Sequence, residues 1–132
     1  MSYLELLNKL PDYELKKLQR IQNSDARIIT QQRKFTHITP ILIDLHWLPV
    51  TCRIQYKILL LAFKCIIGKA PAYLASILQP YVPPRALRSA ALHRLQEPSA
   101  QRKYRERAFS VCAPKLWNSL PLSPTMQDNR NF

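Results

Sequence analysis

Apolar residues recur at helical spacing along two long stretches of the chain. In the first, from Asp12 to Thr30, a rotation of about 100° per residue separates two arcs. The apolar arc holds Leu15, Leu18, Ile21, Ile28 and Ile29, and the other holds Lys16, Lys17, Arg20 and Arg27. The pattern predicts an amphipathic helix with a basic stripe. Asp25 falls within the apolar arc, where it either pairs with an arginine or marks a less buried part of the helix.

The second stretch predicts a helix from Val50 to Ile67 that begins after Pro49. One face of this helix gathers Ile54, Ile58, Leu61, Ala62 and Cys65, and further apolar residues widen it. A helix that is apolar over so much of its circumference is expected to be the central element of the core. Gly68, the only glycine, lies where a left-handed residue would end the helix.

Shorter elements are predicted around these two helices. A helix is expected before Pro11, another from Thr39 as N-cap with Pro40 to about His46, and another after Pro71. The apolar alternation over residues 108–111 is compatible with extended backbone. Pro114 and Pro121 bracket a two-turn helix. Prolines between residues 81 and 98 favour irregular backbone. The fold class is therefore mostly α, a small single-domain bundle of four to five helices with proline-rich irregular connections, over residues 1–122, with a frayed polar tail over 123–132.

Composition and charge narrow the function. The chain has 132 residues, 47% of them hydrophobic, which suffices for one core. Its net charge of +12 is spread along the whole chain and favours a polyanionic partner, either nucleic acid or an anionic membrane surface; a basic domain without such a partner is the alternative. The longest apolar run is too short to span a bilayer, and the N-terminus does not resemble a signal peptide. Three separated cysteines suit reduced core thiols, so a cytoplasmic or nuclear location is expected, not secretion.

Catalytic and metal chemistry find no support in the residue spacing. His37, His46, Cys52 and Cys65 lack the paired spacing of a zinc site, and no cysteine lies in a nucleophile turn. A single glycine excludes phosphate-cradling loops, and the eight acidic residues are dispersed, unlike the clustered carboxylates of a two-metal nuclease or polymerase. We therefore expect no cofactor, no metal and no catalysis by this chain alone.

Basic residues near aromatic residues are the remaining candidate chemistry. Phosphate contacts are predicted for Lys16, Lys17, Arg20, Arg27, Arg33, Lys34, Arg102, Lys103, Arg105 and Arg107. The alternative is that these residues form only the solvated faces of the fold. Core positions are predicted for Trp47, Ile58, Leu61, Phe109 and Trp117. Trp117 is expected to be largely buried against the second long helix, although a tryptophan can also be an exposed platform on which a base stacks.

Four stretches, in the same order, resemble one known family. They are "LQRIQNSDARIIT", "HITPILIDLHWLPVTCRIQYKILLLAFKCIIGKAPAYL", "YVPPRALRS" and "RAFSVCAPKLWNSLP". Over nearly the whole chain the sequence is similar to the region downstream of the catalytic reverse-transcriptase domain in vertebrate LINE-type retrotransposon polyproteins, which lack long terminal repeats. No stretch matches the aspartate motif of the polymerase palm or the endonuclease. The resemblance implies a non-catalytic accessory segment that holds RNA or DNA, with the missing polymerase domains as a further partner.

The sequence also departs from this family. It has Ser24 and Asp25 where members tend to have small apolar residues, reads "YRER" before "RAFS" where members have a glycine-containing turn, and ends early. Two other functions are therefore open at this point. The chain is either an inert, truncated relic of a retrotransposon, or a protein-interaction module that packs on the missing polymerase thumb and exposes apolar surface when isolated.

Overall fold

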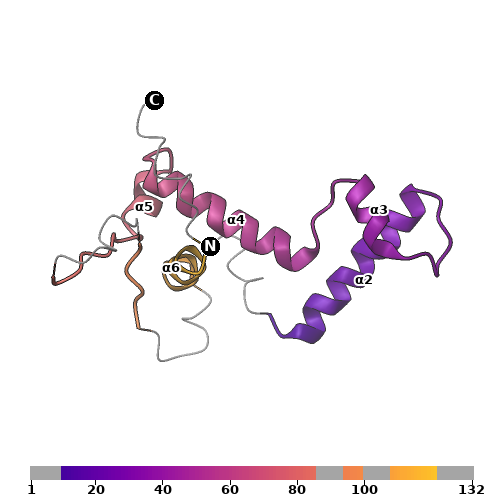
Figure 1. Cartoon of the computed structure of the whole chain (residues 1–132), viewed down its shortest axis with the longest axis horizontal. Helices are drawn as coiled ribbons and strands as arrows, with labels where there is room; N and C mark the ends of the chain where they lie inside the picture. Colours follow the sequence, from indigo (N-terminus) through magenta and orange to yellow (C-terminus); the bar gives the residue numbers. More distant parts are fainter. Residues whose placement is uncertain (1–9, 86–93, 100–107, 122–132) are drawn as a thin grey trace.

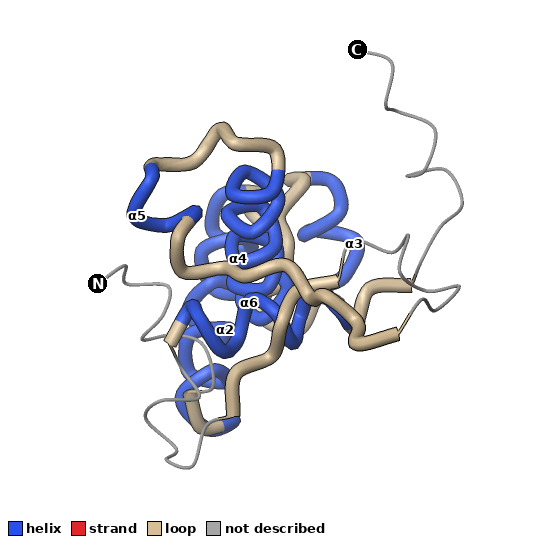
Figure 2. Tube along the Cα trace, turned by 90° about the vertical axis from the view of Figure 1, so that its left-hand side faces the viewer, coloured by secondary structure: helices blue, strands red, loops and turns tan. Residues whose placement is uncertain are grey.

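The computed structural model describes residues 10–85, 94–99 and 108–121. Within them it has five helices, joined by loops and without a strand (Figure 2). They are α2 (Asp12–Ile29), α3 (Ile38–Asp44), α4 (Val50–Ile66), α5 (Ala72–Ala75) and α6 (Phe109–Asn118). The prediction of a mostly α-helical fold with irregular connections is confirmed. The predicted helix before Pro11 and the tail after residue 122 lie outside the described residues.

The helices form an elongated arrangement with α4 in the middle (Figure 1). At one end α2 packs on α3, and at the other end α5 and α6 pack on α4. Each end has its own group of buried apolar side chains. The α2–α3 cluster consists of Ala26, Ile41 and Leu42. The larger α4–α6 cluster consists of Ile54, Ile58, Ala62, Cys65, Leu78, Leu95, Phe109, Cys112 and Ala113. The expectation that α4 is central therefore holds for the larger cluster, while the α2–α3 pair buries a second one.

The five predicted core residues divide between these clusters. Ile58 and Phe109 are buried members of the α4–α6 cluster. Leu61 and Trp117 are partly buried and pack against that cluster from its edge. Trp47 is partly buried against the α2–α3 cluster instead. Trp117 thus contacts the core that includes α4, as predicted, but it keeps part of its surface in solvent.

The buried face of α2 differs from the predicted apolar arc. Gln22 and Ala26 are the buried residues of this helix, while Ile21, Ile28 and Ile29 are exposed. The helix is therefore rotated so that a face containing glutamine points inward, and only Leu15 and Leu18 of the predicted arc are partly buried. Asp25 is exposed and has no ion pair within the described residues, so it marks a less buried part of the helix and not a buried arginine pair.

Hydrogen bonds of two glutamines explain this rotation. Gln19 accepts a hydrogen bond from the backbone N–H of Val50 through Oε1 at 2.8 Å, which satisfies a free donor at the start of α4. Gln22 donates from Nε2 to the carbonyl oxygen of Leu48 at 2.9 Å. Nε2 of Gln19 also donates to Oε1 of Gln22 at 2.9 Å. We call this pair the glutamine clasp, and it ties α2 to the connection between α3 and α4.

Three helices end in the same backbone motif. Gly68 has φ 72°, and the N–H groups of Gly68 and Lys69 donate to the carbonyls of Cys65 and Lys64, which is the Schellman pattern. The predicted glycine stop of α4 is therefore confirmed. Gln31 (φ 53°) and His46 (φ 55°) end α2 and α3 with the same two bonds, although neither is glycine. These two endings have no glycine signal in the sequence.

Two predicted element boundaries are wrong. Helix α3 begins at Ile38 with His37 as its N-cap, so Thr39 lies inside the first turn and does not cap it. Pro40 still fits there, because the N–H groups of the first turn have no partner within the helix. Helix α6 begins at Phe109 and contains Pro114, so the extended backbone expected over 108–111 is helical from Phe109 onward.

Burial explains why α6 tolerates its proline. Phe109, Cys112 and Ala113 are spaced three and four residues apart and face the α4–α6 cluster. The apolar contacts of that face offset the one backbone hydrogen bond that Pro114 cannot donate. Near the end of α6, the Asn118 carboxamide accepts from the Leu95 N–H at 3.0 Å and donates to the Leu95 carbonyl at 2.9 Å. Asn118 thereby fastens residues 94–97 to the helix.

Candidate nucleic-acid interface

The first group of predicted phosphate-binding residues lies along the exposed side of α2. Lys16, Lys17 and Arg20 are all exposed. Lys17 is paired with Glu14 at 3.3 Å and lies over the Tyr13 ring at 5.3 Å from its centroid. The side chains of Lys16 and Arg20 have no ion pair or hydrogen bond with another described residue. Lys16 and Arg20 are therefore the cations of this helix that are available to a partner.

Arg27 has a different role from the other cations of α2. Its side chain is partly buried, and its Nε and Nη2 donate to the Thr36 carbonyl oxygen at 3.3 and 3.1 Å. These bonds hold the loop between α2 and α3 against the end of α2. The structure therefore makes Arg27 a structural residue whose remaining donors alone are available to a phosphate.

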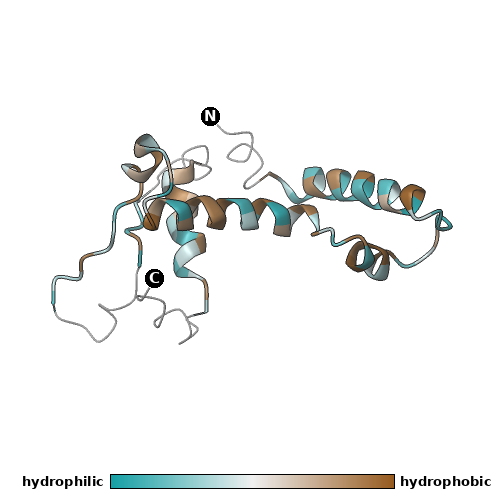
Figure 3. Cartoon of the chain, turned by 90° about the horizontal axis from the view of Figure 1, so that it is seen from above, coloured by the Kyte–Doolittle hydropathy of each residue, from teal (hydrophilic) through white to brown (hydrophobic). Residues whose placement is uncertain are grey.

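The α2–α3 loop, residues 30–37, carries two more of the predicted cations. Arg33 and Lys34 are exposed at its tip, and a backbone hydrogen bond of 3.0 Å from the Thr36 N–H to the Arg33 carbonyl closes a turn there. The loop forms the outer end of the molecule in Figures 1 and 3. Phe35 lies in this turn with 93% of its surface exposed, and Nζ of Lys34 is 6.0 Å from its ring centroid.

A basic stripe on α4 was missed by the sequence reasoning. Arg53, Lys57 and Lys64 are exposed, and their spacing of four and eleven residues places them on one side of the helix, away from its buried face. No acidic residue occurs between Asp44 and Glu97 in the sequence. These three cations therefore have no acidic neighbour on their own helix, in contrast to the cations of α2. Figure 3 shows the resulting alternation of hydrophilic and hydrophobic positions along both α2 and α4.

The remaining candidates lie outside the described residues. Arg102, Lys103, Arg105 and Arg107 were predicted to contact phosphates, and the structure does not describe this segment. The structure therefore brings together Lys16, Lys17 and Arg20 on one helix, with Arg27 linking that helix to the loop that holds Arg33 and Lys34.

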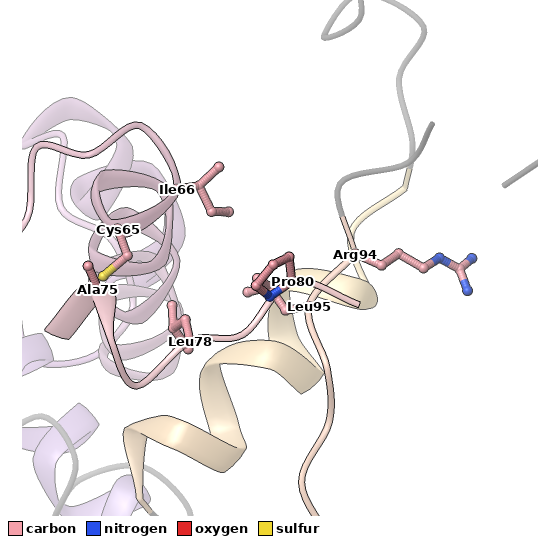
Figure 4. A pocket seen from close by; sticks show the side chains of 7 residues that line it. All are labelled: Cys65, Ile66, Ala75, Leu78, Pro80, Arg94 and Leu95. Atoms are coloured by element: carbon pink, nitrogen blue, oxygen red, sulfur yellow. The ribbon is translucent and has the colours of Figure 1, made fainter. Parts of the chain in front are cut away.

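A small pocket lies on the opposite part of the molecule, between α4, α5, residues 78–80 and residues 94–95. Its volume is about 220 Å³, and its lining includes Cys65, Ile66, Ala75, Leu78 and Leu95 (Figure 4). The Arg94 side chain extends away from these apolar residues. An apolar lining without convergent polar groups does not indicate a catalytic site.

The cysteines are only partly as predicted. Cys65 and Cys112 are buried, as expected of core thiols, whereas Cys52 is exposed. Cys52 lies in the first turn of α4, on the side away from the buried Ile54. Burial raises the pKa of the Cys65 thiol above its ordinary value, because the thiolate loses its hydration there. Cys65 is therefore a protonated, weakly reactive thiol at neutral pH.

Two further properties of the described residues bear on function. No three histidine, cysteine or acidic side chains gather there in a way that could hold a metal ion. None of the helices in the described ranges combines the length and the apolarity that a bilayer crossing requires. In comparisons with family models, curated proteins and solved structures, nothing matches this chain.

Proposed function

We propose that this chain is a non-catalytic nucleic-acid-binding segment that contacts RNA or DNA through phosphates. The proposal extends to its origin, the region downstream of a LINE-type reverse-transcriptase domain, which the four sequence stretches resemble. In such a polyprotein the missing polymerase domains would perform the chemistry, while this segment holds template RNA or target DNA.

One observation carries the proposal. Apart from Lys17 with Glu14, the exposed cations of α2, the α2–α3 loop and α4 have no ion pair with a described residue. Cations that are not paired within a protein are free to neutralise phosphates and release their counterions. The stripes offer charge without an array of hydrogen-bonding side chains that could read base edges, so binding is expected to be nearly indifferent to base sequence.

Salt dependence is the direct test. The full chain is titrated into labelled single-stranded RNA and duplex DNA at several salt concentrations, and binding is followed by fluorescence anisotropy. Four phosphate contacts imply that log affinity falls with log salt at a slope of about −3 to −4. Reversing Lys16 and Arg20 to Glu should reduce the steepness by roughly 1.4 for RNA and 1.8 for duplex DNA, two contacts' worth.

Two further double variants locate the interface. Lys57→Glu with Lys64→Glu tests the α4 stripe. Lys69→Glu with Lys115→Glu is the matched control, because each double reversal lowers the net charge by four, from +12 to +8, at exposed positions. If the control flattens the slope as much as the other two variants do, only net charge matters and the stripes form no interface. Absence of binding at low salt would reject the proposal and favour the inert relic.

Exposed apolar residues favour a second candidate function, a protein-interaction module. Ile21, Ile28 and Ile43 are 59%, 73% and 65% exposed on α2 and α3. Branched aliphatic side chains on a solvated helix face are typical of a surface that another protein covers. Size-exclusion chromatography with light scattering tests this function. Self-association that salt does not reverse, and that Ile21→Ser with Ile28→Ser abolishes, would support it; a monomer at all salt concentrations would count against it.

A further inference from the structure

We propose that Phe35 is a stacking residue for single-stranded nucleic acid, with Arg33 and Lys34 contacting the adjoining phosphates. This inference rests on the proposed function and gives it a preference that the basic stripes alone do not supply. Phe35 was not among the residues that the sequence analysis selected. With 93% of its surface exposed, it is the most exposed of the large apolar residues in the described part of the chain.

The exposed Phe35 belongs to a loop that hydrogen bonds fix in place. Arg27 donates to the Thr36 carbonyl at 3.1 and 3.3 Å, and the Thr36 N–H donates to the Arg33 carbonyl at 3.0 Å. At the start of the loop, the left-handed residue Gln31 and the bond from the Gln32 N–H to the Arg27 carbonyl, 2.9 Å long, fix the chain direction. The loop therefore presents the Phe35 ring outward from a turn that is hydrogen-bonded on both sides.

The sequence around Phe35 is also basic. The chain has no acidic residue between Asp25 and Asp44, while Arg27, Arg33 and Lys34 lie within that interval. An exposed aromatic ring beside unpaired cations matches the two parts of a single strand, because an unstacked base offers a π-face and the backbone offers charge. A duplex fits less well, since its bases are already stacked on each other.

The position of the cations favours nucleic acid over an anionic membrane as the partner. An anionic membrane surface also attracts cations and accepts an aromatic ring, but the cations on α2 extend the same charged surface away from the loop tip. Arg20 lies near the middle of α2 and Lys16 about one helical turn before it, so the basic residues run over about 20 Å of helix from Lys16 to the loop. An extended polyanion can follow such a line of cations.

The test compares Phe35→Ala with wild type on four probes: single-stranded RNA, duplex DNA, phosphatidylserine-containing vesicles and inorganic polyphosphate, which has no bases. Loss of one stacked base corresponds to about 5- to 150-fold weaker binding to RNA. Binding to polyphosphate should not change, and Phe35→Trp should retain RNA affinity. The matched control is Phe63→Ala, which removes an exposed phenylalanine of α4 in place of the one in the loop. This variant should bind as wild type does. Circular dichroism checks that each variant keeps its helicity.

Each outcome has a separate meaning. If wild type binds neither RNA nor duplex DNA, the proposed function itself fails. If wild type binds RNA with the expected salt slope but Phe35→Ala binds equally well, only the stacking role is wrong. Equal weakening on RNA and polyphosphate would likewise overturn stacking, because a base-free polymer cannot report it. If Phe35→Ala loses binding to phosphatidylserine-containing vesicles but not to RNA, the loop is a membrane contact and the inference is wrong.

Discussion

The glutamine clasp allows a sharp test of how α2 is attached. Gln22 is 9% exposed, and its carboxamide makes two hydrogen bonds, one to the Leu48 carbonyl and one from Gln19. Gln22→Ala removes both, at about 0.5–1.5 kcal/mol each, so the loss from hydrogen bonding is roughly 1–3 kcal/mol. The lost methylene adds about 0.8 kcal/mol. We therefore expect the free energy of unfolding to fall by roughly 2–4 kcal/mol, measured by urea denaturation.

Gln22→Glu makes the same argument depend on pH. The carboxylate cannot donate to the Leu48 carbonyl, so the folded state favours the protonated acid and raises its pKa above the unfolded value of about 4.3. At a pH below the unfolded pKa the protonated acid can donate to the Leu48 carbonyl, so the stabilising contribution of this hydrogen bond is present. That contribution is lost as the pH rises through the pKa of the folded state. The deficit relative to wild type should therefore be small at pH 4 and large at pH 7.

A matched control separates the clasp from a general effect of added charge. Gln55→Glu places the same substitution at an exposed position of α4 and should change stability little at either pH. An equal deficit at pH 4 and pH 7 for Gln22→Glu would refute the hydrogen-bond argument. So would a Gln22→Ala variant within about 0.5 kcal/mol of wild type, because surface substitutions alone reach that size.

Three further predictions use the same unfolding measurement or simple labelling. Gly68→Ala should destabilise by about 1–2 kcal/mol, since an alanine there must adopt the left-handed conformation, and His46→Gly should stabilise for the opposite reason. A change of stability in the same direction for both variants would contradict this prediction. Asn118→Ala should destabilise by about 1–3 kcal/mol through loss of its two backbone bonds, with Asn118→Asp failing to rescue it because a carboxylate cannot donate. A thiol reagent should modify Cys52 at once and Cys65 only after unfolding, and the contribution of Cys65 to stability should decline as the pH rises above its ordinary pKa.

Local signals allowed the prediction of α4 and its limits. Pro49 fixes the start, the apolar period fixes the face that contains Ile54 and Ile58, and Gly68 fixes the end. Each of these signals acts through the conformation or burial of the residue itself. The same reasoning failed at Pro114, because packing of the α6 face against α4 decides that boundary. A proline signal is local, and the contacts that override it come from residues distant in the sequence.

The orientation of α2 could not be predicted, because burial of glutamine depends on partners that the sequence does not identify. A carboxamide is unfavourable in the interior until a donor and an acceptor meet it, and here they are the backbone groups of Val50 and Leu48. The hydrophobic pattern alone selects the isoleucine side. Similarly, Gln31 and His46 end their helices in a conformation that the sequence signals only at glycine.

The basic stripe of α2 was predicted because its cations recur at helical spacing. The spacing of Arg53, Lys57 and Lys64 marks one face of α4, but the breadth of the apolar pattern drew attention to the opposite face. Phe35 had no such signal, because a single aromatic residue in a loop has no periodicity. Its exposure depends on how Arg27 holds the turn, which only the folded chain determines.

The observed rotation of α2 also bears on the two candidate functions. Because Gln22 points inward, Lys16 and Arg20 lie on one outer flank of α2 and Ile21 and Ile28 lie on another. The helical rotation of about 100° per residue places these two flanks roughly 100° apart. A strand of nucleic acid along the basic flank would leave the isoleucines uncovered, and a protein on the isoleucines would leave the cations free. The two functions thus use different surfaces of one helix. The charge reversals and the isoleucine substitutions should therefore act independently, and a loss of RNA binding on changing Ile21 and Ile28 would show that the two surfaces are one.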